Sequence, residues 1–210
     1  MSFAGFPPEA LRFYEGLAAD NSKAYWERHR DVYEDAIREP MELLVHDLVA
    51  EFGGAKIFRP YRDVRFSKDK TPYKTHQGAV FTADRGTGSR YVEISANGLR
   101  LGGGRWHLER EELAKVRRAI DHDLHGKQLE QIKTALEDDG LQYAAAELKT
   151  APKGYPKDHP RIELLRRKRH AAIASPGTPA WLHQAEAKDH IAETFRRVEP
   201  LIAWLEKHTG

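Results

Sequence analysis

The sequence predicts an α+β fold: an antiparallel β-meander of about four or more strands, packed with N-terminal and C-terminal α-helices. Apolar residues recur at helical spacing near both ends of the chain, while the middle alternates apolar and polar residues between glycine turns. The Asn97-Gly98 dipeptide adds a strong hairpin signal. We therefore expect a single α+β domain over residues 1–210, helical over 8–53, with the meander over 56–104 and a helical, loop-rich part over 105–210.

Prolines and glycines divide the first helical part. A short helix follows Pro8, which suits a first helical turn. Trp26 and Tyr33 then share one face of a longer helix, and Pro40 predicts a kink or break in it, because proline removes a backbone hydrogen bond. The helix after Pro40 is expected to end at Gly53.

The expected strands begin with residues 57–66, a run rich in aromatic and β-branched residues. In a strand, Arg62 shares a face with Val64 and Phe66, so we expect it to be largely buried and paired with an acid or with backbone carbonyls. The next strands are the runs QGAVFTA, RYVEISA and LRLGG. The glycines of LGGG indicate either a bend in the strand or a close approach of backbone to a ligand.

Helices return after residue 105. Apolar stripes predict two helices separated by Gly126, and prolines at 152, 156 and 160 then predict an irregular basic loop. The last stripe is helical again, and Pro200 is expected to divide it into two helices.

The composition sets limits on function. The chain has 210 residues, no cysteine and a formal net charge of +2. Cysteine nucleophiles, disulfides and thiolate metal sites are excluded, and the total charge does not favour nucleic acid as a partner. Neither a signal peptide nor an apolar run long enough for a bilayer is evident, so we expect a cytoplasmic protein without a membrane partner.

The strongest functional signal is the run RPYRDVRFSKDKTPYKTH, residues 59–76, which we call the basic segment. Its cations far outnumber its acids, and arginine forks fit phosphate or carboxylate. We expect it to bind an anionic small molecule or a phosphate group through Arg59, Arg62, Arg65, Ser67, Lys68, Lys70, Tyr73 and Lys74. The alternative is a solvated strand edge, whose lysines prevent aggregation.

Three residues of this segment are candidates for proton transfer: Asp63, Asp69 and His76. The alternative for the two aspartates is that they neutralise and orient neighbouring arginines. The histidines lack the spacing of a helical metal motif, so no metal and no other cofactor is expected.

A second basic, proline-rich segment covers residues 149–168. We predict that the two segments meet across one cleft, because irregular polar loops commonly carry binding residues on a rigid scaffold. The second segment would contribute Lys153, Tyr155, His159 and Arg161. The alternative is that each loop caps a different end of the sheet.

Four pieces of the sequence resemble an uncharacterised family, the domain of unknown function 2461: DNSKAYWERHRDVY, RDVRFSKDKTPYKTH, LGGGRWHLE and APKGYPKDHPRIELLRRK. They span nearly the whole chain in the expected order. The resemblance implies no established activity and adds no cofactor.

Three functions remain open from the sequence. The first is an enzyme acting on a phosphorylated or otherwise anionic small molecule. The second is a non-catalytic module for nucleotide or nucleic acid, of which nucleic acid is the less favoured. The third is a protein-binding module whose basic loop contacts an acidic surface. A single pocket would favour the first, a basic stripe across a flat sheet the second, and a broad apolar patch the third. The sequence does not indicate an oligomeric state.

Overall fold

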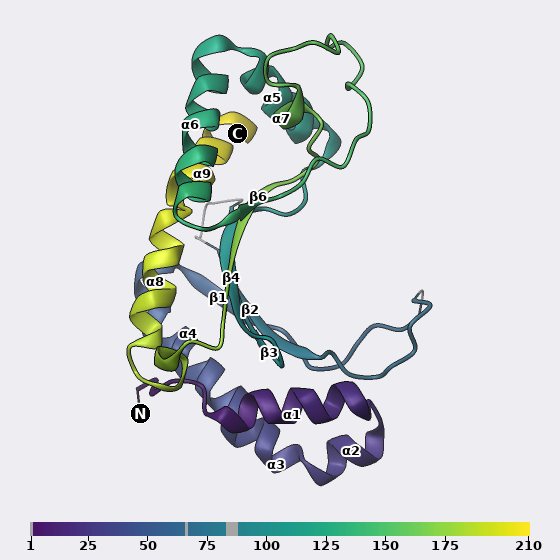
Figure 1. Ribbon diagram of the computed structural model, residues 1–210, viewed down its shortest axis with the longest axis vertical. Helices are drawn as coiled ribbons and strands as arrows, with labels where there is room; N and C mark the ends of the chain where they lie inside the picture. The colour runs from purple at the N-terminus through teal and green to yellow at the C-terminus, as the bar shows by residue number, and fades with distance from the viewer. Residues whose placement is uncertain (1, 66, 83–87) are drawn as a thin grey trace. The chain divides into compact units, whose positions relative to one another are not determined.

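The computed structural model describes residues 2–65, 67–82 and 88–210. Among these residues, six strands form an antiparallel sheet in the order β1-β2-β3-β4-β6-β5, and helices from both ends of the chain accompany it (Figure 1). The strands are β1 Gly54–Ile57, β2 His76–Thr82, β3 Ser89–Ser95, β4 Gly98–Arg105, β5 Gln142–Tyr143 and β6 His170–Gly177. The first four are neighbours in chain order, so the predicted α+β fold with a β-meander is confirmed.

The chain divides into two compact units. The first contains residues 1–82, 91–101 and 175–193, and the second contains 83–90, 102–174 and 194–210. Strands β3, β4 and β6 each contribute residues to both units. The expected single domain stays a prediction.

The helices of the first unit bury apolar residues. They are α1 Pro8–Ala19, α2 Lys23–Arg28, α3 Arg30–Tyr33, the π-helix η1 Glu34–Arg38, α4 Glu39–Phe52 and the 3-10 helix η2 Ala180–His183. Helix α4 contacts β1 and β2 and buries Met41, Leu44 and Leu48. The spacing of these three residues is that of one helix face, as the sequence predicted.

The helical path does not break at Pro40. Residues 34–38 form a π turn, in which the backbone N–H of Glu39 donates to the carbonyl of Glu34, and α4 follows with Pro40 in its first turn. Proline lacks an N–H and its ring crowds the preceding turn, so a wider turn directly before it relieves both problems. The interruption predicted at Pro40 is therefore a change of helix type over the preceding residues.

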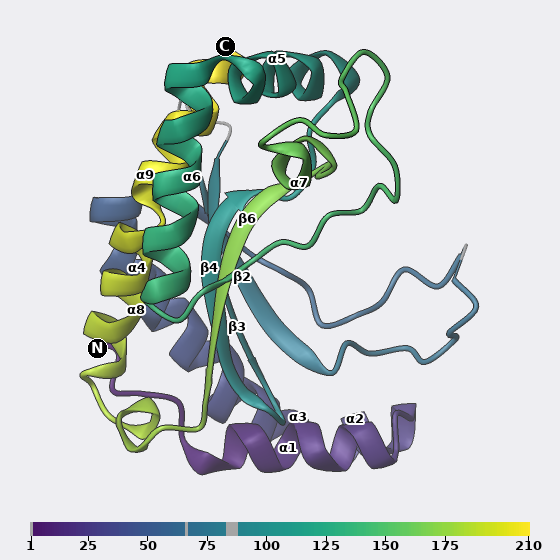
Figure 2. The ribbon, with the colours of Figure 1, turned by 45° about the horizontal axis from the view of Figure 1, so that its top comes forward.

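The second unit is built from helices packed on one another (Figure 2). They are α5 Arg110–Asp121, α6 Asp123–Asp138, α7 Ile162–Leu165 and α9 Glu199–Thr209, while α8 Ala187–Arg197 passes from the first unit into the second. Helix α9 contacts both α5 and α6, and their apolar faces form one core that includes Ile120, Leu129 and Trp204. Helices α8 and α9 meet at Val198, next to Pro200, so the predicted division at this proline is confirmed.

The glycine run lies inside β4 and permits close packing of protein on protein. A Cβ at Gly102 would lie 2.0 Å from the carbonyl oxygen of Ala172, and one at Gly103 would lie 2.7 Å from a Val198 methyl group. Gly104 has a φ of +135°, which side chains rarely adopt. Approach of β6 and of the start of α9 therefore accounts for these glycines.

Two strand expectations need correction. Strand β1 ends at Ile57, and beyond it only an isolated bridge joins Tyr61 to Tyr73, so the strand predicted over 57–66 is wrong. Regular ladder pairing is interrupted here, because the Pro60 carbonyl accepts a bond from the Lys74 N–H but Pro60 has no N–H to donate in return. Strand β6 was not predicted; its short run of alanines and one isoleucine lacks both the length and the alternation that indicate strands. Phe66 and the end of the run QGAVFTA lie outside the described residues.

Candidate functional site

The basic segment is the long connection between β1 and β2, and it forms an irregular hairpin beyond these strands (Figure 1). Backbone N–H groups of Arg62 and Lys74 donate to the carbonyls of Pro72 and Pro60, at 2.9 and 2.8 Å. The bridge between Tyr61 and Tyr73 lies between these bonds. The base of the hairpin therefore continues the sheet for a few residues and fixes which side chains lie on each face.

Helices cover one of these two faces. The buried Gln77 accepts a hydrogen bond of 2.7 Å from the Tyr33 hydroxyl of α3, and the Tyr73 ring stacks on Trp26 of α2 at 4.3 Å. Side chains alternate along a strand, so His76, the neighbour of Gln77, lies on the other face. The Tyr91 hydroxyl lies over Gly78 on that same side, since a Cβ at Gly78 would be 2.6 Å from it.

On this face a group of polar residues interacts with His76 or Glu93, and we call it the sheet-face cluster: Arg62, Lys74, His76, Tyr91, Glu93 and Arg100. The Tyr91 hydroxyl donates to Glu93 at 2.6 Å, and the Arg100 guanidinium lies 4.0 Å from the same carboxylate. The side chain of Glu93 is only 13% exposed. All six residues belong to the first unit.

Electrostatic effects on His76 show that the cluster is cationic. Burial lowers the pKa of His76 most; Glu93 raises it, and Lys74, Arg62 and Arg100 lower it further. The imidazole is therefore neutral at neutral pH. Burial also lowers the pKa of Lys74, with a contribution from Arg59, so another cation nearby is unfavourable and an anion would be stabilised.

The far part of the basic segment is partly neutralised by its own aspartates. Asp63 accepts two hydrogen bonds from the Arg65 guanidinium, at 2.6 and 2.9 Å, which hold the pKa of Asp63 below its usual value. Asp69 accepts from the backbone and hydroxyl of Thr71, lowering the pKa of Asp69, and it also pairs with Arg62. This geometry supports the alternative in which both aspartates orient their neighbours rather than transfer protons.

Arg62 is paired as predicted, but the expected burial is wrong. Its side chain is 31% exposed, because its phase in the hairpin places it opposite the helix-covered face. Partly exposed ion pairs of this kind contribute at most about 1 kcal/mol. Loss of Arg62 should therefore cost far less stability than a fully buried pair would.

The other residues predicted in the segment occupy varied environments. The Lys70 and Lys74 ammonium groups donate to the carbonyls of Val64 and Arg59, and Ser67 accepts from the backbone of Asp69. Arg59 and Lys68 are exposed. Tyr73 is buried against Trp26, and Asn21 bonds its backbone, so this residue supports the hairpin.

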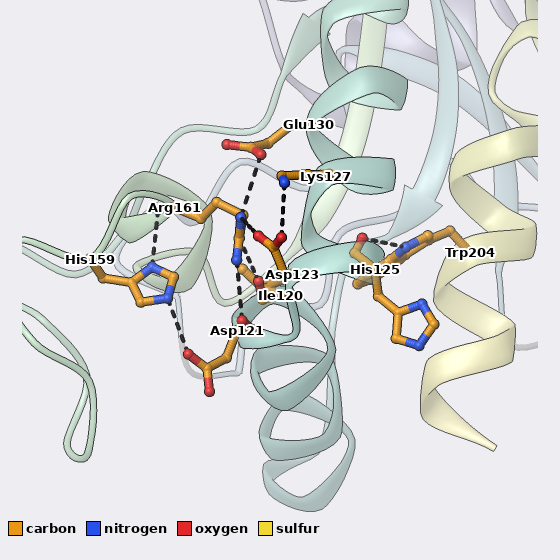
Figure 3. Close-up of polar contacts among 9 residues, drawn as sticks. All are labelled: Ile120, Asp121, Asp123, His125, Lys127, Glu130, His159, Arg161 and Trp204. Atoms are coloured by element: carbon orange, nitrogen blue, oxygen red, sulfur yellow. Dashed lines mark hydrogen bonds and ion pairs between the residues drawn. The ribbon is translucent and has the colours of Figure 1, made fainter.

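In the second basic segment, the predicted residues divide into buried and exposed ones. The Arg161 side chain, 6% exposed, donates to the carbonyls of Ile120 and Asp121 at the end of α5 (Figure 3). His159 contacts the Asp121 carboxylate at 3.1 Å and accepts a bond from the Arg161 backbone. These two side chains fasten the loop to the α5–α6 junction. Lys153 is exposed, and Tyr155 is half-buried against the core of the second unit.

The predicted cleft between the two basic segments remains a prediction, because residues 59–76 belong to the first unit and 149–168 to the second. Over the described ranges no group of three or more His, Asp or Glu side chains is placed to hold a metal ion. Nor does any described helix combine the length and apolarity needed to cross a membrane.

Three members of the sheet-face cluster were not predicted: Tyr91, Glu93 and Arg100. For two of them the sequence contains a signal: the alternation in RYVEISA places Tyr91 and Glu93 on the strand face opposite the buried Val92 and Ile94. What the sequence did not provide was the pairing that brings this face beside His76.

Comparisons with known proteins add a family and nothing more specific. A family model described as "Conserved hypothetical protein (DUF2461)" matches residues 9–204. No curated protein and no solved structure matches the chain significantly.

Proposed function

This chain belongs to the family of conserved hypothetical proteins DUF2461, and from its own residues we propose that the sheet-face cluster binds a small anionic or phosphate-bearing ligand. The observation that carries the proposal is the cationic environment of the half-buried His76, whose pKa Lys74, Arg62 and Arg100 all lower. Positive charge held in a partly desolvated site favours an anion more strongly than the same charge in open solvent.

A small ligand fits these observations better than a polymer does. The cations of the cluster come from the hairpin base and one strand, and the cations further along the hairpin are partly neutralised by its own aspartates. A nucleic acid would need a longer positively charged track along its backbone. Protein binding through the basic segment has no specific observation in its favour.

The second candidate function is catalysis, in which the protein acts on such a ligand and His76 transfers a proton. The lowered pKa leaves a neutral imidazole near the Glu93 carboxylate, which is the protonation state a general base requires. Of the three residues first considered for catalysis, His76 alone has this environment.

Thermal unfolding with inorganic phosphate or sulfate tests the binding proposal. At a hundred times its dissociation constant, a ligand stabilises the folded state by roughly 2.7 kcal/mol, or about 5 to 10 °C for a chain of this size. We expect this shift in the wild type and in Lys68→Gln, whose residue is exposed outside the cluster. Arg100→Gln should reduce it by more than half. An equal shift in both variants, or none in the wild type, would contradict the proposal.

A further inference from the structure

A second candidate site lies on the opposite, helix-covered side of the hairpin base. A pocket of about 400 Å³ opens between the helical run from α2 to α4 and residues 57–61. Its volume is within the range of roughly 300–1,000 Å³ that small-molecule sites occupy. All of its lining belongs to the first unit. It shares no residue with the sheet-face cluster, because Tyr61 and Arg62 lie on opposite faces of the hairpin.

Aromatic rings from the helices and from the hairpin line part of this pocket. Trp26 is held parallel to the buried Tyr73, with ring centres 4.3 Å apart, and it lies 4.7 Å from Tyr33. Tyr61 lies 6.0 Å from the indole, yet 51% of this residue is exposed. A tyrosine ring half in solvent beside a rigid aromatic group offers a surface on which a planar ring can stack.

Arginines line the same pocket, Arg30 from the helical run and Arg59 from the hairpin beside Tyr61. The charged residues of the helical face follow one another at intervals of four: Arg30, Glu34, Arg38 and Glu42. Arg38 forms ion pairs with both glutamates, at 2.8 and 2.9 Å, so the charges of these three residues are already paired with one another. Within the part of the chain that the structure describes, Arg30 and Arg59 form no ion pair. The pocket thus has one positive charge in excess, and two of its guanidinium groups can bind a ligand.

The π-helix forms part of the same wall, since Glu34 and Arg38 are its first and last residues. Short π segments inside α-helices occur frequently at functional sites. Tyr33 lines the pocket, and its hydroxyl is held in place because it donates to Gln77. Burial raises the pKa of Tyr33, so the hydroxyl keeps its proton.

We propose that this pocket binds a small planar aromatic anion, an aryl carboxylate or an aryl phosphate. The ring would stack beside Tyr61 and Trp26, and the anionic group would bind Arg59 and Arg30. Neither half of the ligand suffices alone: the aromatic wall has no selectivity for anions, and exposed arginines bind a bare anion weakly in water.

Calorimetric titration of the full chain tests this inference. Phenyl phosphate and benzoate should bind, the stronger of them defining the preferred anion, whereas benzyl alcohol should bind at least tenfold more weakly. Arg59→Gln and Arg30→Gln should each weaken binding five- to tenfold. The matched control is Arg65→Gln, which removes an arginine of the same hairpin that is paired with Asp63 outside the pocket.

A second variant keeps the two proposed sites distinct. Arg100→Gln alters the sheet-face cluster, so it should leave benzoate binding unchanged while it reduces the response to inorganic phosphate by more than half. Arg30 lies in a different element from Arg59, so its variant remains informative if Arg59→Gln does not fold. The inference is overturned if neither aryl anion binds the wild type, if benzyl alcohol binds as tightly, or if Arg65→Gln weakens binding as much as Arg59→Gln.

Discussion

His170 in the second unit is a fully buried ionisable residue whose surroundings disfavour its charge. The Tyr143 hydroxyl contacts its Nδ1 at 3.0 Å, and its Nε2 has no hydrogen-bond partner among the described residues. Burial lowers the pKa of His170 to about 3, and Arg167 and Arg117 contribute to the same effect. Protonation is therefore strongly unfavourable in the folded state.

The first prediction is that His170 makes folding sensitive to acid. Its folded pKa lies below the unfolded value of about 6.5, so its contribution is fully present above pH 6.5 and is lost as pH falls towards 3. The free energy of unfolding should fall by up to about 5 kcal/mol across this window from this residue alone. Urea unfolding at pH 7, 6, 5 and 4 measures it. His170→Gln should flatten the slope, whereas His107→Gln, on the exposed surface, should not. Equal slopes in both variants would show that His170 is not responsible.

At the scale of elements, Asn21 connects the basic segment to the helices. It lies between α1 and α2, and its side-chain amide bonds the backbone of Tyr73 twice, donating to the carbonyl at 3.0 Å and accepting from the N–H at 3.1 Å. The Asn21 side chain therefore bonds the hairpin backbone as a residue of a neighbouring strand would. The next residue, Ser22, caps α2 by accepting a hydrogen bond from the Tyr25 backbone.

The second prediction concerns this connection. Asn21→Ala leaves the Tyr73 backbone groups without partners, which should cost roughly 1–3 kcal/mol of stability. Hydrogen exchange across residues 59–76 should become faster, and any ligand of the sheet-face cluster should bind more weakly. Asp20→Ala is the control, because its carboxylate makes only a distant exposed contact with Arg28. Unchanged exchange in Asn21→Ala would show that the stacking of Tyr73 on Trp26 alone holds the hairpin.

The elements themselves were largely predictable, because their local patterns agree with their environments. Apolar periodicity identified the helices, and the Asn97-Gly98 turn identified the β3–β4 hairpin. The errors fall where local pattern is overruled: at Pro60, where aromatic residues favour a strand but proline interrupts the ladder, and at β6, which pairs with its neighbours despite weak strand composition. Likewise, the sequence alone made His76 and Lys74 candidates, while the place of Glu93 and Arg100 beside them depends on pairing between strands.

At the scale of the whole molecule, the two compact units are not consecutive stretches of sequence. The first unit needs residues 91–101 and 175–193 in addition to its first 82 residues. The backbone of Phe6, for example, bonds that of Leu182 at 2.9 Å, and the His183 ring bonds the Phe6 carbonyl at 2.7 Å. No single cut in the chain releases one unit intact.

The third prediction follows from this connectivity. A fragment of residues 1–82 retains α1 to β2 but lacks the strands and the 3-10 helix that complete its unit. It should therefore show no cooperative thermal transition and should be digested rapidly by trypsin, whereas the full chain should unfold cooperatively. A sharp transition in the fragment would show that its helices and the β1–β2 pair are sufficient.

The π turn before Pro40 also has a consequence for how the length of this chain can change. A π turn holds one residue more than an α turn, so a single deletion within 34–38 could leave a regular α-helix without rotating the residues on either side. Elsewhere in the helix, the same deletion would rotate everything after it by about 100° and remove Met41 and Leu44 from the core. Pro40 opposes even the permitted deletion, because its ring would then meet the carbonyl of a normal turn. A regular α-helix in place of the π turn would therefore require two changes together, the deletion of one residue and the replacement of Pro40.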